Sequence, residues 1–151
     1  MNINTYKIRF NSDRIGELVK EETFAYSTDE TVIDSPEKAA RLIESLWGAS
    51  KLAQEHFWLL ALDGVHRVVG AFVVSVGSLN ASLVHPREVF QRAILAGAAS
   101  IIIAHNHPSG MLDISENDRE VTRRIRQAGD IIGIRLDDHI IVASGDFVSA
   151  Y

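Results

Sequence analysis

An apolar run at residues 101–104 leads directly into two histidines and a turn, and this stretch constrains how the rest of the chain can fold. The run is rich in isoleucine, as in a buried strand, and side chains two positions apart on a strand point to the same face. His105 and His107 should therefore share one face, roughly 6.6 Å apart along the strand. Residues 108–110, Pro-Ser-Gly, then turn the chain. The sequence predicts two imidazoles that converge at the end of a core strand.

A helix start follows the turn and returns a carboxylate toward the histidines. Ser115 is a common N-cap residue, and Asp118 stands three positions later, which is the spacing of a capping box. One Asp118 oxygen can bond the helix backbone while the other binds a metal ion. Two neutral imidazoles and one carboxylate, with a fourth position open to water, form the ligand set of a catalytic zinc site. Rival carboxylates near the helix start are Asp113, Glu116 and Glu120.

Composition limits the chain to a few classes of protein. With 151 residues and 46% hydrophobic content, it can bury one good core, so we expect one main domain. The absence of cysteine excludes disulfides and thiolate metal sites. The formal net charge of −5 opposes broad capture of nucleic-acid backbones, which depends on lysine and arginine. No apolar signal region or long apolar run is found, and we expect a cytoplasmic protein without a membrane partner.

Periodic patterns after residue 34 predict alternating helices and strands. Ser35 can cap a helix and Pro36 is tolerated at its first position, so a core-facing helix is expected from there. Residues 55–63 form an apolar run that is typical of a central strand. Further helices are expected over 85–97 and 115–129, and further strands over 66–76, 101–104, 137–143 and 147–150. This alternation favours an α/β domain with a mixed β-sheet flanked by helices.

Residues 1–34 carry no catalytic pattern, and we expect an N-terminal extension before a domain over residues 35–151. Apolar and basic residues alternate over 6–10, as in an edge strand. Residues 12–22 are charged and weakly patterned. The extension can be an added strand, a partner-binding arm or a partly disordered leader, and the sequence does not choose among the three.

The residues around the two histidines resemble a known class of metalloproteases. The pattern His-x-His, seven residues, Ser, two residues, Asp at positions 105–118 matches the signature of the JAMM (MPN+) metalloproteases. Within that class the chain resembles the RadC family, through segments at 79–90, 104–110 and 138–142. The resemblance extends from about Ser35 to Tyr151. It implies a three-layer cytidine-deaminase-like (JAB/MPN) domain.

Two features depart from the family pattern. Residues 111–114 lack the prolines that commonly stand between the glycine and the serine, although the length of the segment is kept. Longer members carry an N-terminal helix-hairpin-helix module of the kind that binds DNA, and these 151 residues show none. The chain thus resembles a short member of the family, and the resemblance does not define the path of the loop.

The resemblance implies a zinc-dependent hydrolase that acts on a peptide or protein substrate, at a peptide or isopeptide bond. His105, His107 and Asp118 would hold Zn²⁺, which lowers the pKa of its bound water from near 16 to about 7. Glu55 stands where the family has its catalytic glutamate, and it would carry the water's proton to the leaving amine. Ser115 would hydrogen-bond the developing oxyanion.

The sequence is also compatible with two other functions. The family's traditional label suggests a DNA-repair factor, but the acidic charge and the missing module count against direct nucleic-acid binding. The other is a metal-binding interaction module without catalysis, against which the complete ligand set and Glu55 count. Asp138 and His139 also belong to the family pattern, and we expect them to support the site or the fold rather than to bind metal.

Overall fold

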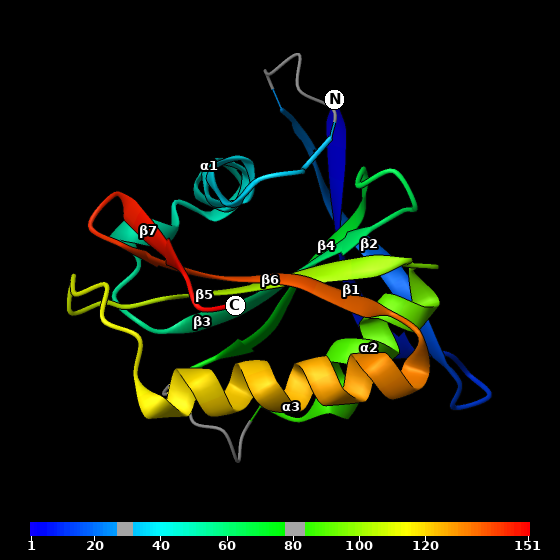
Figure 1. The fold of residues 1–151 in the computed structure, drawn as a ribbon. Coiled ribbons are helices and arrows are strands. Elements are labelled where there is room, and N and C mark those ends of the chain that lie inside the picture. Colours follow the sequence, from blue (N-terminus) through cyan, green and yellow to red (C-terminus); the bar gives the residue numbers. More distant parts are fainter. Residues whose placement is uncertain (27–31, 78–83) are drawn as a thin grey trace.

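One mixed sheet runs through the described residues of the computed structural model, which are 1–26, 32–77 and 84–151. Its strands are β1 (Asn2–Phe10), β2 (Gly16–Ala25), β3 (His56–Leu62), β4 (Val68–Val76), β5 (Ser100–Asn106), β6 (Arg135–Ala143) and β7 (Asp146–Ser149). They lie in the order β2-β1-β4-β3-β5-β6-β7 (Figure 1). β5 pairs antiparallel with β3 and parallel with β6, which makes the sheet mixed.

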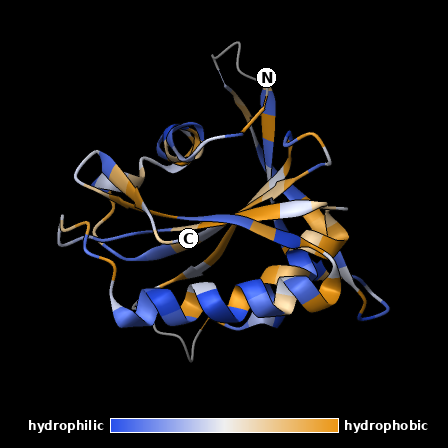
Figure 2. Cartoon of the chain, in the orientation of Figure 1, coloured by the Kyte–Doolittle hydropathy of each residue, from blue (hydrophilic) through white to orange (hydrophobic). Residues whose placement is uncertain are grey.

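Helices cover both faces of this sheet and complete three layers. α1 (Pro36–Trp47) packs on one face, and α2 (Pro86–Leu95) and α3 (Glu116–Ile132) pack on the other (Figure 1). A short 3-10 helix, η1 (Ala49–Lys51), follows α1. Successive β3 residues alternate between the two cores, with Trp58 on the α1 side and Leu59 on the α3 side. In Figure 2 the strands between the helices are largely hydrophobic, whereas much of α3 is hydrophilic. The predicted α/β architecture is confirmed.

β3 and β5 form the buried centre of the sheet. Every residue of β5 is buried, and so is every residue of β3 after His56. The antiparallel register sets Phe57 opposite His105, and the parallel register sets His105 opposite Ile141. The start of β3 and the end of β5 therefore meet at the same end of the sheet.

The helices begin where capping residues predict. Ser35 caps α1, and its side chain accepts a hydrogen bond from the Lys38 N–H at 3.3 Å. Ser115 caps α3 in the same way. α2 begins at Pro86 as expected, although the His85 side chain makes no capping bond. The expected terminal hairpin is present as β6 and β7. No helix of the described segments combines the length and hydropathy that crossing a bilayer requires.

α3 continues past Gly129, where the sequence predicted its end. The helix runs to Ile132, and Gly133 caps it with a φ of 85°. Gly129 is buried, and a Cβ atom at this position would lie 2.4 Å from the backbone oxygen of Ile134. The glycine thus allows the chain beyond the helix to pack closely against it, and it does not end the helix.

The first strand lies inside the sheet, so its predicted edge position is wrong. β1 pairs antiparallel with β2 along its whole length, and it meets β4 in parallel at Thr5 and Ala71. β2 is the edge strand, and none of its residues is buried, which explains why residues 12–22 lack hydrophobic alternation. The described part of the N-terminal segment is therefore an added pair of strands. Residues 27–31 of this segment, and residues 79–83 of the family-like pattern, lie outside the described residues.

Gly129→Ala should lower the free energy of unfolding by about 2 kcal/mol, because the added methyl group meets the Ile134 carbonyl and forces a backbone shift. Urea titration followed by circular dichroism measures this free energy. Gly64→Ala is the matched control, since a Cβ atom there meets no atom of residues 1–26, 32–77 and 84–151 within 4 Å. The control should change stability by less than about 0.5 kcal/mol. Equal stability of the two variants would contradict the close packing at Gly129.

Candidate metal centre

Two histidines stand together at the end of β5. His105 is 1% exposed and belongs to the strand, whereas His107 lies just beyond it and is half-buried. The His107 N–H donates to the Val142 carbonyl oxygen at 2.9 Å, which continues the pairing with β6. Gly110, with a φ of 82°, closes the following turn by donating its N–H to the His107 carbonyl oxygen. Backbone contacts thus fix the positions of both imidazoles.

Asp118 is held in the first turn of α3 by a complete capping box. Its backbone N–H donates to Ser115 Oγ, and its Oδ2 accepts from the Ser115 N–H, both at 3.0 Å. The side chain is buried, and the N-terminal end of a helix favours a negative charge. The capping role predicted for this pair is confirmed, and it leaves the carboxylate directed toward β5.

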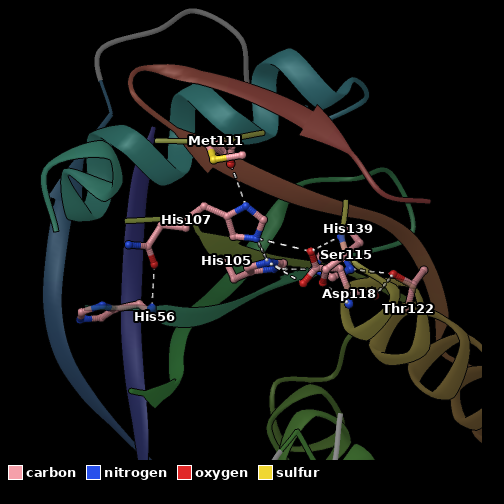
Figure 3. A network of polar contacts seen from close by, with 9 residues as sticks. His56, His105, His107, Met111, Ser115, Asp118, Thr122 and His139 are labelled. Atoms are coloured by element: carbon pink, nitrogen blue, oxygen red, sulfur yellow. Dashed lines mark hydrogen bonds and ion pairs between the residues drawn. The ribbon is translucent and has the colours of Figure 1, made fainter. Parts of the chain in front are cut away.

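Three electron-pair donors meet in the space between β5 and α3 (Figure 3). The Nε2 atoms of His105 and His107 lie 3.0 Å apart. Asp118 Oδ1 lies 3.1 Å from His105 Nε2, and Asp118 Oδ2 lies 3.4 Å from His107 Nε2. Within residues 1–26, 32–77 and 84–151, this is the one group of such side chains close enough to hold a single ion. The metal group does not include the three rival carboxylates, which are Asp113, Glu116 and Glu120.

Hydrogen bonds behind His105 decide which of its ring nitrogens carries the proton. The Thr122 hydroxyl donates to the Asp118 carbonyl oxygen at 2.9 Å, so its single proton is used there. His139 Nδ1 lies 2.7 Å from Thr122 Oγ1, and it must therefore donate its proton to this hydroxyl oxygen. His139 Nε2 is left as an acceptor, and it faces His105 Nδ1 at 2.8 Å. His105 therefore carries its proton on Nδ1 and presents an unprotonated Nε2 to the other two donors.

His107 is held in the same tautomer by a different contact. Its Nδ1 lies 2.9 Å from the Met111 carbonyl oxygen, which can only accept, so Nδ1 carries the proton. Two unprotonated Nε2 atoms and one carboxylate then face one another with no proton to share. Such a group is repulsive unless a cation lies between its members. The residues fit a metal ion that prefers nitrogen and oxygen ligands.

Two buried groups of the site have shifted pKa values. Burial acts to raise the pKa of Asp118, but attraction to the His105 ring when that ring is protonated, together with hydrogen bonds from Ser115, holds this pKa well below its ordinary value. The carboxylate is therefore ionised at neutral pH. Burial lowers the pKa of His139 well below its ordinary value, so this imidazole stays neutral. A neutral His139 is what the hydrogen bonds to Thr122 and His105 require.

An open cleft of about 550 Å³ lies beside this group. Its walls include Glu55, His107, Ser115 and Asp118. The structure thus brings both catalytic residues predicted from the sequence into one cleft with two of the predicted ligands. Ser115 Oγ accepts from the Asp118 N–H and lies on the wall of this cleft.

Two supporting residues of the site had no role in the sequence interpretation. Thr122 lies four residues after Asp118, and this spacing places both on one face of α3, so the helical pattern did carry a signal. Met111 contributes only a carbonyl oxygen, which no side-chain pattern reveals.

The two remaining residues of the family pattern lie on opposite faces of β6. His139 contacts His105 and supports the site, as expected. Asp138 lines a pocket on the α1 side together with Ile102, and its Oδ1 accepts from Ser149 Oγ at 2.6 Å. Asp138 therefore joins β6 to β7 and does not approach the metal group.

Thr122→Val should weaken metal binding about 10-fold or more, because loss of the hydroxyl removes the acceptor that keeps the His139 proton on Nδ1. His139 can then hold its proton on Nε2 and donate it to His105 Nδ1. The His105 proton would then lie on Nε2, the nitrogen that faces the metal group. Competition with a chromophoric chelator measures the affinity for Zn²⁺. Thr122→Ser keeps a hydroxyl and should bind nearly as tightly as the wild type. Unchanged affinity in Thr122→Val would contradict the assigned tautomer.

Known proteins resemble this chain over most of its length. A family model described as RadC-like JAB domain matches residues 33–151. The UPF0758 protein of Rubrobacter xylanophilus is 46% identical over 131 residues, which are 87% of this chain and 57% of that protein. UPF0758 protein YsxA of Bacillus subtilis is 46% identical over 136 residues, which are 90% of this chain and 55% of that protein. A UPF0758 protein of Shouchella clausii is 52% identical over 119 residues, which are 78% of this chain and 50% of that protein.

The chain spans about half the length of these curated relatives. The family match covers the sheet from β3 onward, all three α-helices named above, and every residue of the metal group. The resemblance found in the sequence is therefore confirmed, and the chain belongs to the family of RadC-like JAB domains.

Proposed function

We propose that this chain is a zinc-dependent hydrolase that cleaves a peptide or isopeptide bond with a metal-activated water molecule. The observation that carries the proposal is a group of three unprotonated donors beside a cleft that also contains Glu55. Metal ligands alone suit many functions, but ligands beside a carboxylate and a hydroxyl suit hydrolysis.

The identity of the metal follows from the donor set. Two imidazoles and one carboxylate are common ligands of catalytic Zn²⁺, whereas Ca²⁺ and Mg²⁺ prefer sites made of oxygen. The same set also binds Fe²⁺ in some oxygenases. Glu55 supports zinc, because a nearby carboxylate base is needed for hydrolysis and not for oxygen activation.

Each residue of the cleft has a defined part in the proposed reaction. When bound, Zn²⁺ would activate a water molecule and polarise the substrate carbonyl. Glu55 accepts a proton from the attacking water and later donates it to the leaving amine. The Ser115 hydroxyl donates to the carbonyl oxygen as negative charge develops on it. His139 and Thr122 hold the tautomer of His105 and take no proton from the substrate.

The shape of the cleft supports a peptide or protein substrate. A second open cleft, of about 510 Å³, shares Glu55, Pro108 and Ser109 with the first and extends to Gly77. The two clefts therefore adjoin at Glu55. An extended chain can lie across adjoining open clefts, whereas small molecules are usually bound in enclosed, apolar pockets.

Wild-type protein purified without an affinity tag should contain close to one zinc ion per chain, and His107→Ala should contain almost none. Removing one of the three donors leaves too few ligands to hold the ion. Inductively coupled plasma mass spectrometry measures zinc and iron together. Iron in place of zinc, or no metal after reconstitution with Zn²⁺, would contradict the proposed hydrolase.

Glu55→Gln should keep the zinc of the wild type and lower hydrolysis by about 100-fold or more, because the amide cannot accept the water's proton. Zinc-loaded protein is incubated with a library of peptides derived from a proteome, and new termini are identified by mass spectrometry. A peptide cleaved by the wild type then serves as the substrate for rate measurements. Full activity of Glu55→Gln on that peptide would show that another group is the base.

A further inference from the structure

Asn106 stands between the two histidines, but its side chain bonds the backbone around Glu55. Its Nδ2 donates to the Gln54 carbonyl oxygen at 2.9 Å, and its Oδ1 accepts from the His56 N–H at 2.6 Å. The two bonds hold the residues immediately before and after Glu55. Asn106 is 1% exposed, so its side chain is held inside the fold beside this segment.

The strand geometry explains why one residue can make this contact. Neighbouring residues of a strand point to opposite faces, so Asn106 points away from the face that carries His105. It lies on the same side of β5 as Ala104, which packs in the α1 core. The antiparallel register of β3 and β5 brings the start of β3 beside the end of β5. His56 lies across the site from Thr122 (Figure 3).

A third bond holds the same short segment from β4. The Gly77 N–H donates to the Glu55 carbonyl oxygen at 2.8 Å. Three consecutive residues, Gln54, Glu55 and His56, are therefore each held through a backbone atom. The Asn106 carboxamide can bond Gln54 and His56 at once, because it carries a hydrogen-bond donor and an acceptor on the same group. Neither a hydroxyl nor a carboxylate offers this pair of groups with the same geometry.

We propose that Asn106 is a positioning residue that holds the Glu55 carboxylate at a fixed place relative to the metal group. The proposal rests on the proposed function, in which Glu55 is the base. The His-Asn-His segment then positions two different parts of the reaction: the histidines hold the metal, and the asparagine between them holds the residue that moves the proton. A displacement of a catalytic group by about 1 Å can cost on the order of 100-fold in rate.

The test is a double-mutant cycle on the zinc-loaded protein, with the peptide that the wild type cleaves as substrate. Asn106→Ala should keep its zinc and lower kcat by about 10-fold to 100-fold, with KM within about 2-fold of the wild type. Adding Asn106→Ala to Glu55→Gln should lower the residual rate by less than about 2-fold, because the asparagine acts only through the glutamate. Additive losses would show a general structural role and overturn the proposal.

Two further variants separate positioning from damage to the fold. Ser100→Ala is the matched control, since Ser100 is a buried polar residue on the same strand whose Oγ has no hydrogen-bond partner among the described residues, and the kcat of this variant should not change. Asn106→Asp keeps the acceptor for the His56 N–H and loses the donor to Gln54, so its kcat should fall between those of the wild type and Asn106→Ala. If Asn106→Ala does not fold, the Asn106→Asp result decides, and a kcat equal to that of the wild type overturns the proposal.

Hydrogen exchange at the His56 amide reports on the contact without any substrate. This amide should be protected in the wild type and in Asn106→Asp, and it should exchange at least about 10-fold faster in Asn106→Ala. Loss of zinc from Asn106→Ala would mean that the residue supports the ligands and not Glu55, which overturns the proposal. A zinc-loaded wild type that cleaves no peptide removes the proposed function and this proposal together. An active wild type beside a fully active Asn106→Ala removes only this proposal.

Discussion

Two imidazoles and a carboxylate that repel one another lie close together, with the nearest atoms of each pair 3.0 to 3.4 Å apart, and the rest of the site depends on how the fold keeps them there. Two unprotonated imidazole nitrogens and an ionised carboxylate would separate if their side chains were free. They are held by contacts made outside the group: the Met111 carbonyl fixes His107, the capping box fixes Asp118, and His139 fixes His105. The fold thus stores an arrangement that a cation between the donors would stabilise.

Holding this arrangement costs stability, because it buries polar groups at one end of the sheet. His105, His139 and Asp118 are among the buried polar side chains of a largely apolar core. Each of them is hydrogen-bonded, because a buried polar group without a partner costs about 1–3 kcal/mol. Away from this end, β5 presents Ile101, Ile102 and Ile103 to the two cores. Packing of the apolar half of β5 in the two cores therefore holds its polar end in place.

The sequence predicted the parts of the site that lie close together in the chain. His105, His107, Ser115 and Asp118 fall within 14 residues, and strand and helix periodicities relate their side chains directly. The contact of His139 with His105 spans 34 residues and depends on the register of two parallel strands. That register shifts by one residue of β6 between Ile101 and Ile102, and no pattern in the sequence indicates the shift. The fold was predictable in its central strands, whose apolar runs are long.

The sequence-based predictions that the fold contradicts were wrong for a related reason. β1 and β2 are defined by pairing with each other, and β2 is exposed or half-buried along its whole length, so its side chains carry no alternation that a sequence pattern could detect. The sequence predicted a helix end at Gly129, whereas in the fold this glycine is needed for its small size against Ile134. In both cases the deciding contact comes from another part of the chain.

The alternation of side chains along β5 connects the two roles of its polar end. Odd-numbered residues of the strand face the α3 side, where Ile103 packs in the core, and His105 meets Asp118 there. Even-numbered residues face the α1 side, where Ala104 is buried, and Asn106 bonds the backbone beside Glu55. A strand that slipped by one residue would exchange the two faces and lose both sets of contacts at once. Because β3 pairs with β5 as far as His105 and β6 pairs with it as far as Asn106, the same backbone bonds that build the core also fix the metal ligands and the segment that carries Glu55.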